Sequence, residues 1–287
     1  MSTPIINLIE NSNDDSVETV LSAVANNENA VESIHNSERN IDAIASSGAA
    51  SDGLGVNDDA ARISLCILED RDPDNYPDFD SIASDGSFIS DIASSRPASL
   101  LMTASTSGAT SVVNNDSALD EVLSSEPALD AVSASQTARG VFKDAMLTTT
   151  EDDPAQSNFY IAELEGGGGG PGGDTSDGQD GEDTTLGPVV AEGGEKGTSE
   201  GFSEEDGDDG GFIVPDDGVL LEGIVGGGAD GNTAFGGTGG DGGYVKATYI
   251  NVGGDALSLT VGDGGASGDD TRDDGDDGSA TVWYFDR

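Results

Sequence analysis

Few side chains in this sequence could carry out catalytic chemistry. Its 287 residues include one histidine, His35, and one cysteine, Cys66. Ser-His-Asp, Cys-His and two-histidine zinc catalysis are therefore unsupported, and we assign no catalytic or cofactor-binding residue and predict a protein that is not an enzyme. His35 stands where Ala25 and Ala45 stand in the repeat described below, so we expect it in a solvent-facing turn. We expect Cys66 to be a small buried apolar residue.

Calcium is the one cofactor that the sequence leaves open. Acidic residues cluster with glycine at 206–209 (Asp-Gly-Asp-Asp) and 273–277 (Asp-Asp-Gly-Asp-Asp), and carboxylate oxygens are the ligands that calcium prefers. Neither cluster has EF-hand spacing. Gly236–Asp241 begins like a calcium-binding nonapeptide, but Gly243 replaces the required large apolar residue. Solvated acidic loops are the favoured interpretation, and we assign no metal-binding residue.

The charge of the chain excludes several partners. It carries 57 acidic and 10 basic residues, a net charge of −47, which repels nucleic acids and anionic membranes. The longest apolar runs are far too short for a membrane-spanning helix. Asp outnumbers Glu by 39 to 18, and lysine occurs three times. Because molar salt shortens the Debye length to about 3 Å and so screens such repulsion, the composition predicts a halophilic environment.

A ten-residue repeat occupies much of the first half. Apolar pairs at i, i+3 spacing recur every ten residues, in two blocks at 16–50 and 79–150; examples are Ile41/Ile44, Ile89/Ile92 and Leu119/Val122. We interpret each decad as a single helical turn followed by a polar reversal. Two apolar residues per decad cannot form a core alone. The sequence therefore predicts a repetitive stalk that oligomerises, with a homotrimer favoured.

The segment between the two blocks, 51–78, differs from both. Residues 61–68 (Ala-Arg-Ile-Ser-Leu-Cys-Ile-Leu) alternate well enough for one or two short strands. The turn-rich residues 70–78 follow. We interpret 51–78 as a joint between stalk segments, with a small independent domain as the alternative.

Glycine dominates the chain from Gly166 onward, with 37 of the 43 glycines. No strict Gly-x-y triplet runs through them, which excludes collagen. A flexible linker is one interpretation. Runs rich in β-branched and aromatic residues, such as Tyr244–Val252 and Ser279–Phe285, favour a folded glycine-rich β domain at 151–287 instead.

Two resemblances point to one architecture. The decads, best seen at Ala128–Ala138 (Ala-Leu-Asp-Ala-Val-Ser-Ala-Ser-Gln-Thr-Ala), resemble a repeat of tail fibres of tailed viruses. The strand-like 161–165 running into Gly166–Gly170, and Leu257–Gly265 followed by 277–284, resemble the glycine-rich tip domains of phage tail-fibre adhesins. The repeat precedes the tip in this chain, as that architecture requires.

These observations together predict a fold and a function. We expect an elongated, mainly β, oligomeric protein with short helical turns: an attachment segment at 1–15, which has no secretory signal, then the decad stalk, then the glycine-rich tip. The resemblance implies a tail fibre or spike in the virion of a tailed virus of halophilic archaea. The 1–15 region would bind other virion proteins, and the tip would contact a host surface glycan or surface-layer protein. The alternatives are a capsid decoration or turret protein of the same virus and, less favoured, a tailspike glycan depolymerase.

Aromatic residues near the C-terminus are the candidate receptor contacts. They are Tyr244, Tyr249, Trp283 and Tyr284, with the loops 226–243 and 262–278 as the contact surface. Exposed aromatic rings supply binding energy at interfaces. The other interpretation is that these rings form the small core of the glycine-rich domain, as we favour for Trp283.

Overall fold

The computed structural model describes residues 4–173, 176–198, 206–215, 218–226, 237–251, 256–268 and 273–286. The chain divides into two compact units, Met1–Ala145 and Met146–Arg287. It is about 45% helical and 16% strand, so the expected elongated, mainly β fold is wrong. The physical reason is that most decads form two helical turns, where one was expected.

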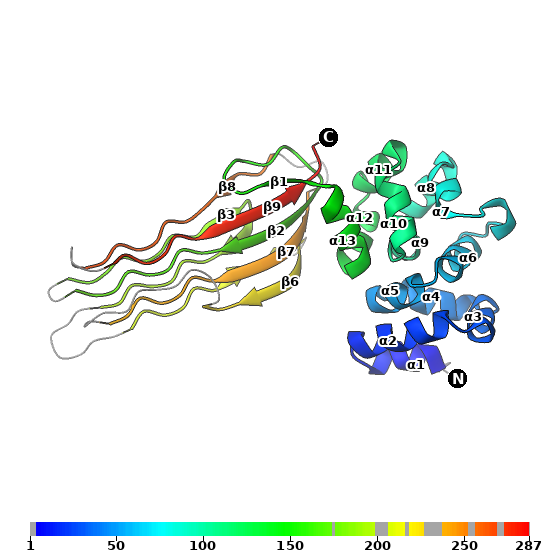
Figure 1. Cartoon of the computed structure of the whole chain (residues 1–287), viewed down its shortest axis with the longest axis horizontal. Coiled ribbons are helices and arrows are strands. Elements are labelled where there is room, and N and C mark those ends of the chain that lie inside the picture. The colour runs from blue at the N-terminus through cyan, green and yellow to red at the C-terminus, as the bar shows by residue number, and fades with distance from the viewer. Residues whose placement is uncertain are drawn as a thin grey trace. The chain divides into compact units, whose positions relative to one another are not determined.

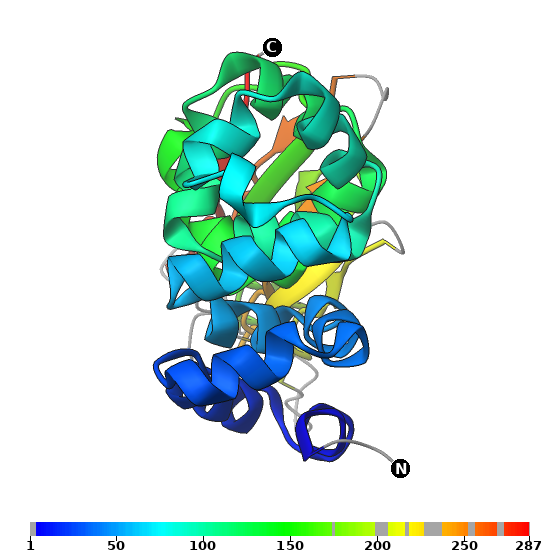
Figure 2. The same cartoon turned by 90° about the vertical axis from the view of Figure 1, so that its right-hand side faces the viewer.

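The first unit consists of short helices (Figure 2). Within its described residues they are α1 (Pro4–Asn11), α2 (Asp14–Ala25), α3 (Glu28–His35), α4 (Glu38–Ala45), α5 (Gly48–Gly55), α6 (Asp58–Leu68), the 3-10 helix η1 (Pro73–Asn75), α7 (Phe79–Ala83), α8 (Gly86–Ala93), α9 (Arg96–Thr103), α10 (Thr106–Val113), α11 (Asp116–Leu123), α12 (Glu126–Ala134) and α13 (Gln136–Ala145).

The ten-residue period is set by helix N-caps. Asn, Ser or Asp precedes the helices at ten-residue intervals, and almost every one accepts a hydrogen bond from a backbone N–H of the first helical turn; they are Asn27, Ser37, Ser47, Asn57 and then Asp85, Ser95, Ser105, Asn115, Ser125. A side chain that satisfies these otherwise unpaired N–H groups favours starting a new helix there. Eight helical residues and two connecting residues therefore make one decad.

The helices bury their apolar pairs against one another within a single chain. Most helices pack on the third helix along, as α2 does on α5, α8 on α11 and α9 on α12. Ile41, Ile44, Ile89 and Ile92 are at most 1% exposed. The apolar stripe therefore needs no second chain to leave water, which removes the reason for expecting an oligomer. The trimer itself stays a prediction.

The N-cap side chains also join successive layers of the stack. The Asn57 amide donates to the carbonyl of Ala25 at 2.7 Å, Asn115 donates to Ala83 at 3.1 Å, and the Ser125 hydroxyl donates to Ala93. Each acceptor is the last residue of a helix and lies 32 residues earlier in the chain. One side chain thus satisfies an N–H at one helix start and a carbonyl at another helix end, groups that a short helix leaves unpaired.

The segment expected to contain short strands is helical. Residues 61–68 lie in α6, whose Ala61, Leu65 and Cys66 are buried. The Arg62 guanidinium donates to the carbonyls of Pro73 and Tyr76, which anchors η1 beside α6. The apparent alternation was one face of a helix capped by Asn57. None of the described helices is long and apolar enough to cross a membrane.

The second unit contains two antiparallel sheets (Figure 1). The five-stranded sheet has the order β1-β9-β2-β7-β6, and the four-stranded sheet has the order β5-β4-β3-β8. The strands are β1 (Leu147–Thr149), β2 (Phe159–Glu165), β3 (Thr184–Leu186), β4 (Val189–Ala191), β5 (Phe212–Ile213), β6 (Gly218–Ile224), β7 (Tyr244–Ile250), β8 (Leu259–Thr260) and β9 (Ser279–Tyr284).

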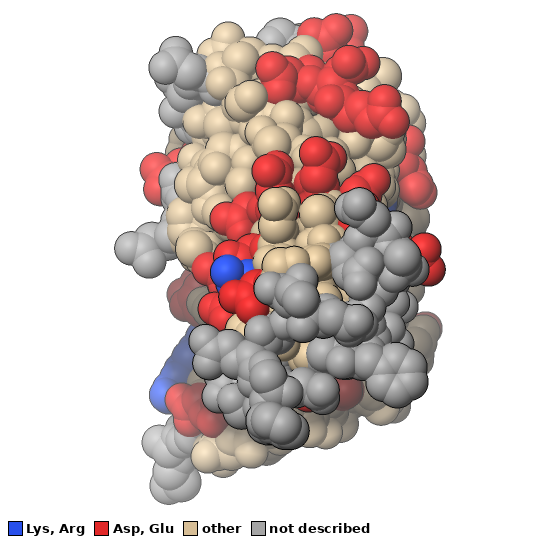
Figure 3. Space-filling view, turned by 90° about the vertical axis from the view of Figure 1, so that its left-hand side faces the viewer, with Lys and Arg blue, Asp and Glu red and all other residues tan. Residues whose placement is uncertain are grey.

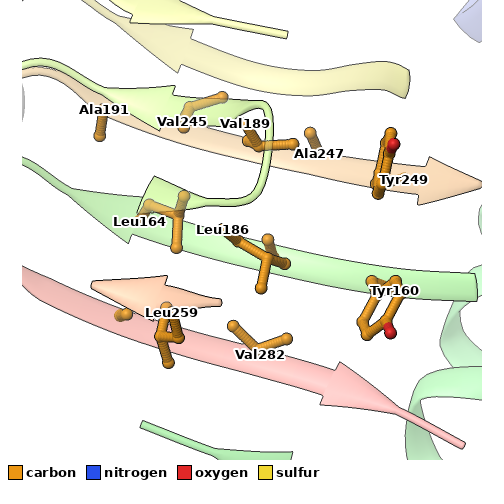
Figure 4. Close-up of a cluster of buried hydrophobic side chains, with 12 residues drawn as sticks. Tyr160, Leu164, Leu186, Val189, Ala191, Val245, Ala247, Tyr249, Leu259 and Val282 are labelled. Carbon is orange, nitrogen blue, oxygen red and sulfur yellow. The ribbon is translucent and has the colours of Figure 1, made fainter. Parts of the chain in front are cut away.

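A small apolar core lies between the two sheets (Figure 4). Leu164, Val245 and Val282 of the larger sheet meet Leu186 and Val189 of the smaller one, and all are fully buried. The core occupies only the part of the unit that has regular strands. Glycine-rich segments follow β2 and precede β7 and β9, and none of their described residues belongs to this core.

Candidate functional site: the glycine bundle

The glycine-rich residues form a bundle of extended segments beside the sheets. We call the segments 166–173, 176–183, 192–198, 206–211, 237–243, 262–268 and 273–278 the glycine bundle. They run out from the sheets and back (Figure 1). Segment 166–173 is buried along its whole length, with other segments hydrogen-bonded around it.

Backbone hydrogen bonds in the bundle follow a period of three. From segment 166–173, the N–H groups of Gly166, Gly169 and Gly172 donate to segment 237–243. The next residues, Gly167, Gly170 and Gly173, donate to segment 176–183, and Gly168 donates to Asp276. A polyproline II-type helix has three residues per turn and no internal hydrogen bonds, so its successive N–H groups point to different neighbours. This geometry satisfies backbone groups that a loop would leave to water.

Close packing of these backbones explains the glycines. A Cβ atom on Gly169 would lie 2.1 Å from the carbonyl oxygen of Glu195, and one on Gly170 would lie 2.2 Å from that of Ala266. No side chain fits at such distances. Position 171 is three residues after Gly168 and so takes the same place in the three-residue period. Proline is tolerated there because it readily adopts the polyproline II conformation, and its carbonyl still accepts a hydrogen bond from the N–H of Gly268 at 3.0 Å.

Aspartates on outer segments bind the backbone of the next segment. Three pairs, each spaced by three residues, accept hydrogen bonds from backbone N–H groups of an adjacent segment. We call these pairs the carboxylate rows: Asp180 and Asp183 accept from Lys196 and Gly193, Asp206 and Asp209 from Thr238 and Asp241, and Asp274 and Asp277 from Ser267 and Gly264, at 2.7–3.1 Å. The acidic residues therefore satisfy backbone N–H groups at the bundle surface with side-chain oxygens.

The carboxylate rows also make the bundle strongly acidic outside. All six aspartates are exposed, and acidic side chains are prominent on the face shown in Figure 3. The N–H and hydroxyl of Thr238 lower the pKa of Asp206 from its ordinary value, since both hydrogen bonds favour the charged carboxylate. Asp206 is thus held in its charged form, and an acidic surface of this kind favours solvent rich in cations.

The acidic clusters considered for calcium belong to these rows. In 206–209 and 273–277, alternate carboxylates are committed to N–H groups of neighbouring segments. In the described part of the chain, no three His, Cys, Asp or Glu side chains converge on a point where a metal ion could bind. Calcium binding by these clusters stays an open possibility of the sequence, without support from a carboxylate cluster in the described residues.

The four aromatic candidates lie on β7 and β9, inside the sheet. Tyr249 is 9% exposed and belongs to the core, and Tyr284 packs against that core. Tyr244 and Trp283 are half-buried. The Tyr244 hydroxyl donates to the Glu163 carboxylate at 2.9 Å, while Lys246 pairs with the same carboxylate at 3.3 Å. Burial and that hydrogen bond raise the pKa of Tyr244.

None of these four residues lies in a loop of the bundle. The proposed contact loops 226–243 and 262–278 contribute bundle segments, and their parts 227–236 and 269–272 lie outside the described residues. For Tyr249 and Tyr284 the structure favours the core interpretation. The role of Tyr244 and Trp283 as receptor contacts stays a prediction.

The two single residues singled out at the start lie in the helical unit. Cys66 is fully buried, as expected, and burial raises the pKa of its thiol to about 11. His35 is half-buried, not in a solvent-facing turn, because it ends α3 with its Nε2 3.2 Å from the carbonyl oxygen of Ala60.

A sequence signal for the bundle exists, but it is local. Glycine recurs at every third position within single segments, as in Gly178/Gly181, Gly207/Gly210 and Gly275/Gly278, and an aspartate of the carboxylate rows precedes most of these glycines. A search for one continuous triplet overlooks this pattern because β-strands and connections interrupt it. No protein-family model matches the chain, and no curated protein matches it.

Proposed function

We propose that this protein is a virion structural protein of a virus of halophilic archaea, a tail fibre or spike whose glycine bundle carries the host-contacting surface. The bundle itself is the observation that carries the proposal. Its segments are fixed by backbone hydrogen bonds at both sheet-proximal and distal positions, such as Gly166 to Gly243 and Gly172 to Gly237. A scaffold held by its backbone can present variable connections without disturbing a side-chain core.

The described segment ends Gly172 and Gly237, and Gly237 and Thr198, are hydrogen-bonded to each other, and four stretches of the sequence, here called the connections, link described segments. They are residues 174–175, 199–205, 227–236 and 269–272, which lie outside the described residues. Side chains of these connections are the candidates for recognition. The acidic exterior supports a role in brine, where salt screens the repulsion between carboxylates.

Adsorption of the virus to host cells tests the proposal. Replacing residues 227–236 by a Gly-Ser sequence of equal length should leave the fold intact and greatly reduce the amount of labelled full-length protein bound to host cells. The control is Pro188→Ser, in the exposed turn between β3 and β4 at the sheet end, which should leave binding unchanged.

The same experiment distinguishes the rival function. Undiminished cell binding after replacement of every one of the four connections would reject a receptor-binding tip. Antibody labelling of intact virions would then show whether the protein decorates the capsid, as a turret protein does, or the tail.

A further inference from the structure

One edge of the five-stranded sheet ends in a long strand. β6 is last in the order β1-β9-β2-β7-β6 and pairs only with β7 among the described residues, and Figure 1 shows it at the margin of the sheet. An edge strand presents a row of backbone N–H and C=O groups that can pair with another chain. The other described edge strands, β1, β5 and β8, have three, two and two residues, whereas β6 has seven. Shortness therefore protects those three edges from pairing but does not protect β6.

The free edges of both sheets lie on the same flank of the unit. A Cβ atom added to Gly223 of β6 would lie 2.4 Å from Cζ of Phe212 in β5, and one added to Gly218 would lie 2.8 Å from Cγ1 of Val214. These contacts place β5, the edge of the smaller sheet, against β6. We call β5, β6 and Val225 the edge flank.

The edge flank exposes apolar side chains. Leu220 and Ile224 of β6 are 46% and 47% exposed, and Ile213 and Val225 are at least half exposed. Seven large apolar residues are exposed in the described part of the chain, and these are four of them. Single exposed apolar residues need no explanation, but a group of them on one flank marks an interaction site.

The sequence of β6 carries few of the features that keep an edge strand from pairing. Glu222 is its one charged residue, and Gly218–Ile224 contains no Lys or Pro, the residues that commonly protect an edge. A register shift between Leu220 and Glu222 leaves Leu221 without a partner on β7. This bulge twists the strand locally and leaves residues on both sides of it paired with β7.

We infer that β6 pairs antiparallel with β6 of a second copy of this chain, about a twofold axis at Leu221. Leu221 is the middle residue of Gly218–Ile224, so this register alone pairs all seven residues. Glu222 then lies opposite Leu220 of the second copy, and no like charges lie directly opposite each other.

A second copy fits this flank better than an unrelated partner does. It brings the same free edge and the same exposed apolar residues, as a self-complementary twofold contact requires. Strand addition uses backbone hydrogen bonds, so it needs no opposite charge from the partner, and molar salt screens the repulsion between two acidic chains. One strand pair is a small contact beside the about 1,600 Å² of a standard interface, so we expect a reversible dimer.

Light scattering on the full-length protein in molar salt tests the inference. The mass should rise from that of one chain to that of two as the protein concentration increases. Leu221→Lys, which places two lysines opposite each other at the axis, and Ile224→Lys should each weaken dimerisation by about tenfold or more. The control is Val56→Lys, at an exposed apolar residue that follows α5 in the helical unit, which should leave the mass unchanged.

Folding of each variant is checked by circular dichroism and by Trp283 fluorescence. Leu221 is half-buried, so Leu221→Lys could unfold the strand. Ile224→Lys changes an exposed side chain and keeps the test valid in that case.

Cross-linking tests the register. Residues directly opposite each other in an antiparallel pair have Cα atoms about 4.5–5.5 Å apart, which suits a disulfide. Leu221→Cys should therefore form a covalent dimer on oxidation with copper phenanthroline. In the same pairing the two copies of Ile224 are about 20 Å apart, so Ile224→Cys should not cross-link. The native Cys66 is buried and should not interfere.

Each outcome decides the inference. A monomer at every concentration would overturn it, as would equal cross-linking of Leu221→Cys and Ile224→Cys. A trimer that the lysine variants leave unchanged would overturn it too and would support the homotrimer expected from the sequence. The adsorption experiment leaves β6 unchanged, so the proposed function stands or fails separately.

Discussion

The two units solve the same problem, a shortage of apolar residues, in opposite ways. In the helical unit, side chains do the joining: isoleucine and leucine pairs fill the spaces between helices, and N-cap residues such as Asn115 link one layer to another. In the glycine bundle, the backbone does the joining, and side chains appear mainly outside, where they are acidic. The comparison teaches that repeated small contacts can replace one large apolar core. The contacts are between side chains in the helical unit and between backbones in the glycine bundle.

The two units should respond differently to the same perturbation. Adding or removing a methyl group should change the stability of either unit. A side-chain core can relax around such a change, whereas two backbones in contact cannot. The chain offers separate probes for the two units: the helical circular dichroism signal reports the first, and fluorescence of Trp283, the only tryptophan, reports the second.

Salt should produce the largest effect. Residues 146–287 contain 32 acidic and 4 basic residues, against 25 and 6 in residues 1–145. Lowering NaCl from about 3 M to about 0.1 M lengthens the Debye length several-fold, so repulsion should unfold both units. We expect Trp283 fluorescence to change at a higher salt concentration than helical circular dichroism. Identical spectra and melting temperatures at both salt concentrations would contradict the halophilic interpretation.

A methyl group inside the bundle should have the next largest effect. Gly169→Ala places a Cβ atom 2.1 Å from a backbone oxygen, and we expect a loss of about 3 kcal/mol or more in the unfolding free energy reported by Trp283. The control is Gly140→Ala in α13, where no atom lies within 4 Å of the added Cβ. It should stabilise the helical unit by about 0.5–1 kcal/mol. A bundle that tolerates Gly169→Ala would show that its segments are not in backbone contact.

Removing an N-cap side chain that joins two helix layers should lower the unfolding free energy by less than a methyl group inside the bundle does. Asn115→Ala removes a hydrogen bond from the N–H of Ala118 and another to the carbonyl of Ala83, both at 3.1 Å. We expect a loss of about 1–2 kcal/mol in the unfolding free energy reported by helical circular dichroism. The neighbouring Asn114→Ala, at an exposed helix end, should change it by less than about 0.5 kcal/mol. Equal effects of the two substitutions would mean that the link between layers contributes nothing.

The ten-residue period could be predicted from the sequence more accurately than the helices that this period forms. The sequence shows the decad period and its apolar pairs, yet the polar reversals predicted there contain Asn27, Ser47 and Ser125, which start helices. N-capping chemistry could have corrected this, because Asn and Ser at ten-residue intervals mark helix starts. The packing of most helices on the third helix along depends on contacts far apart in sequence, which local patterns do not reveal.

The glycine-rich half shows the same limit. Enrichment in β-branched and aromatic residues predicted strands within Tyr244–Val252 and Ser279–Phe285, and the structure has β7 at Tyr244–Ile250 and β9 at Ser279–Tyr284. The bundle was not predicted, since its partners are set by hydrogen bonds between segments such as Gly170 and Gln179 or Gly169 and Gly240. The aromatic candidates were chosen by residue type, and type alone does not tell which side of a strand a ring occupies.

Removing one aspartate of the carboxylate rows should have the smallest effect on stability. It is also the sharpest test of what the acidic side chains do. Asp206 accepts a hydrogen bond from the N–H of Thr238 at 2.9 Å, whereas Asp208, two residues away and also exposed, is outside the rows. Asp206→Ala and Asp208→Ala remove the same charge and so relieve the same repulsion. Any difference between them in the bundle's melting temperature therefore reports the hydrogen bond.

That difference should depend on pH with a definite sign. The pKa of Asp206 is lowered in the folded protein, so its contribution to stability is complete above the ordinary Asp pKa of about 4 and is lost as pH falls through the lower, folded value. We therefore expect Asp206→Ala to melt a few degrees below Asp208→Ala near neutral pH, followed by Trp283 fluorescence in molar salt, and the two melting temperatures to converge in acid. If both variants melt together at every pH, the aspartates of the rows serve only as solvated charge, and the backbone alone holds the bundle.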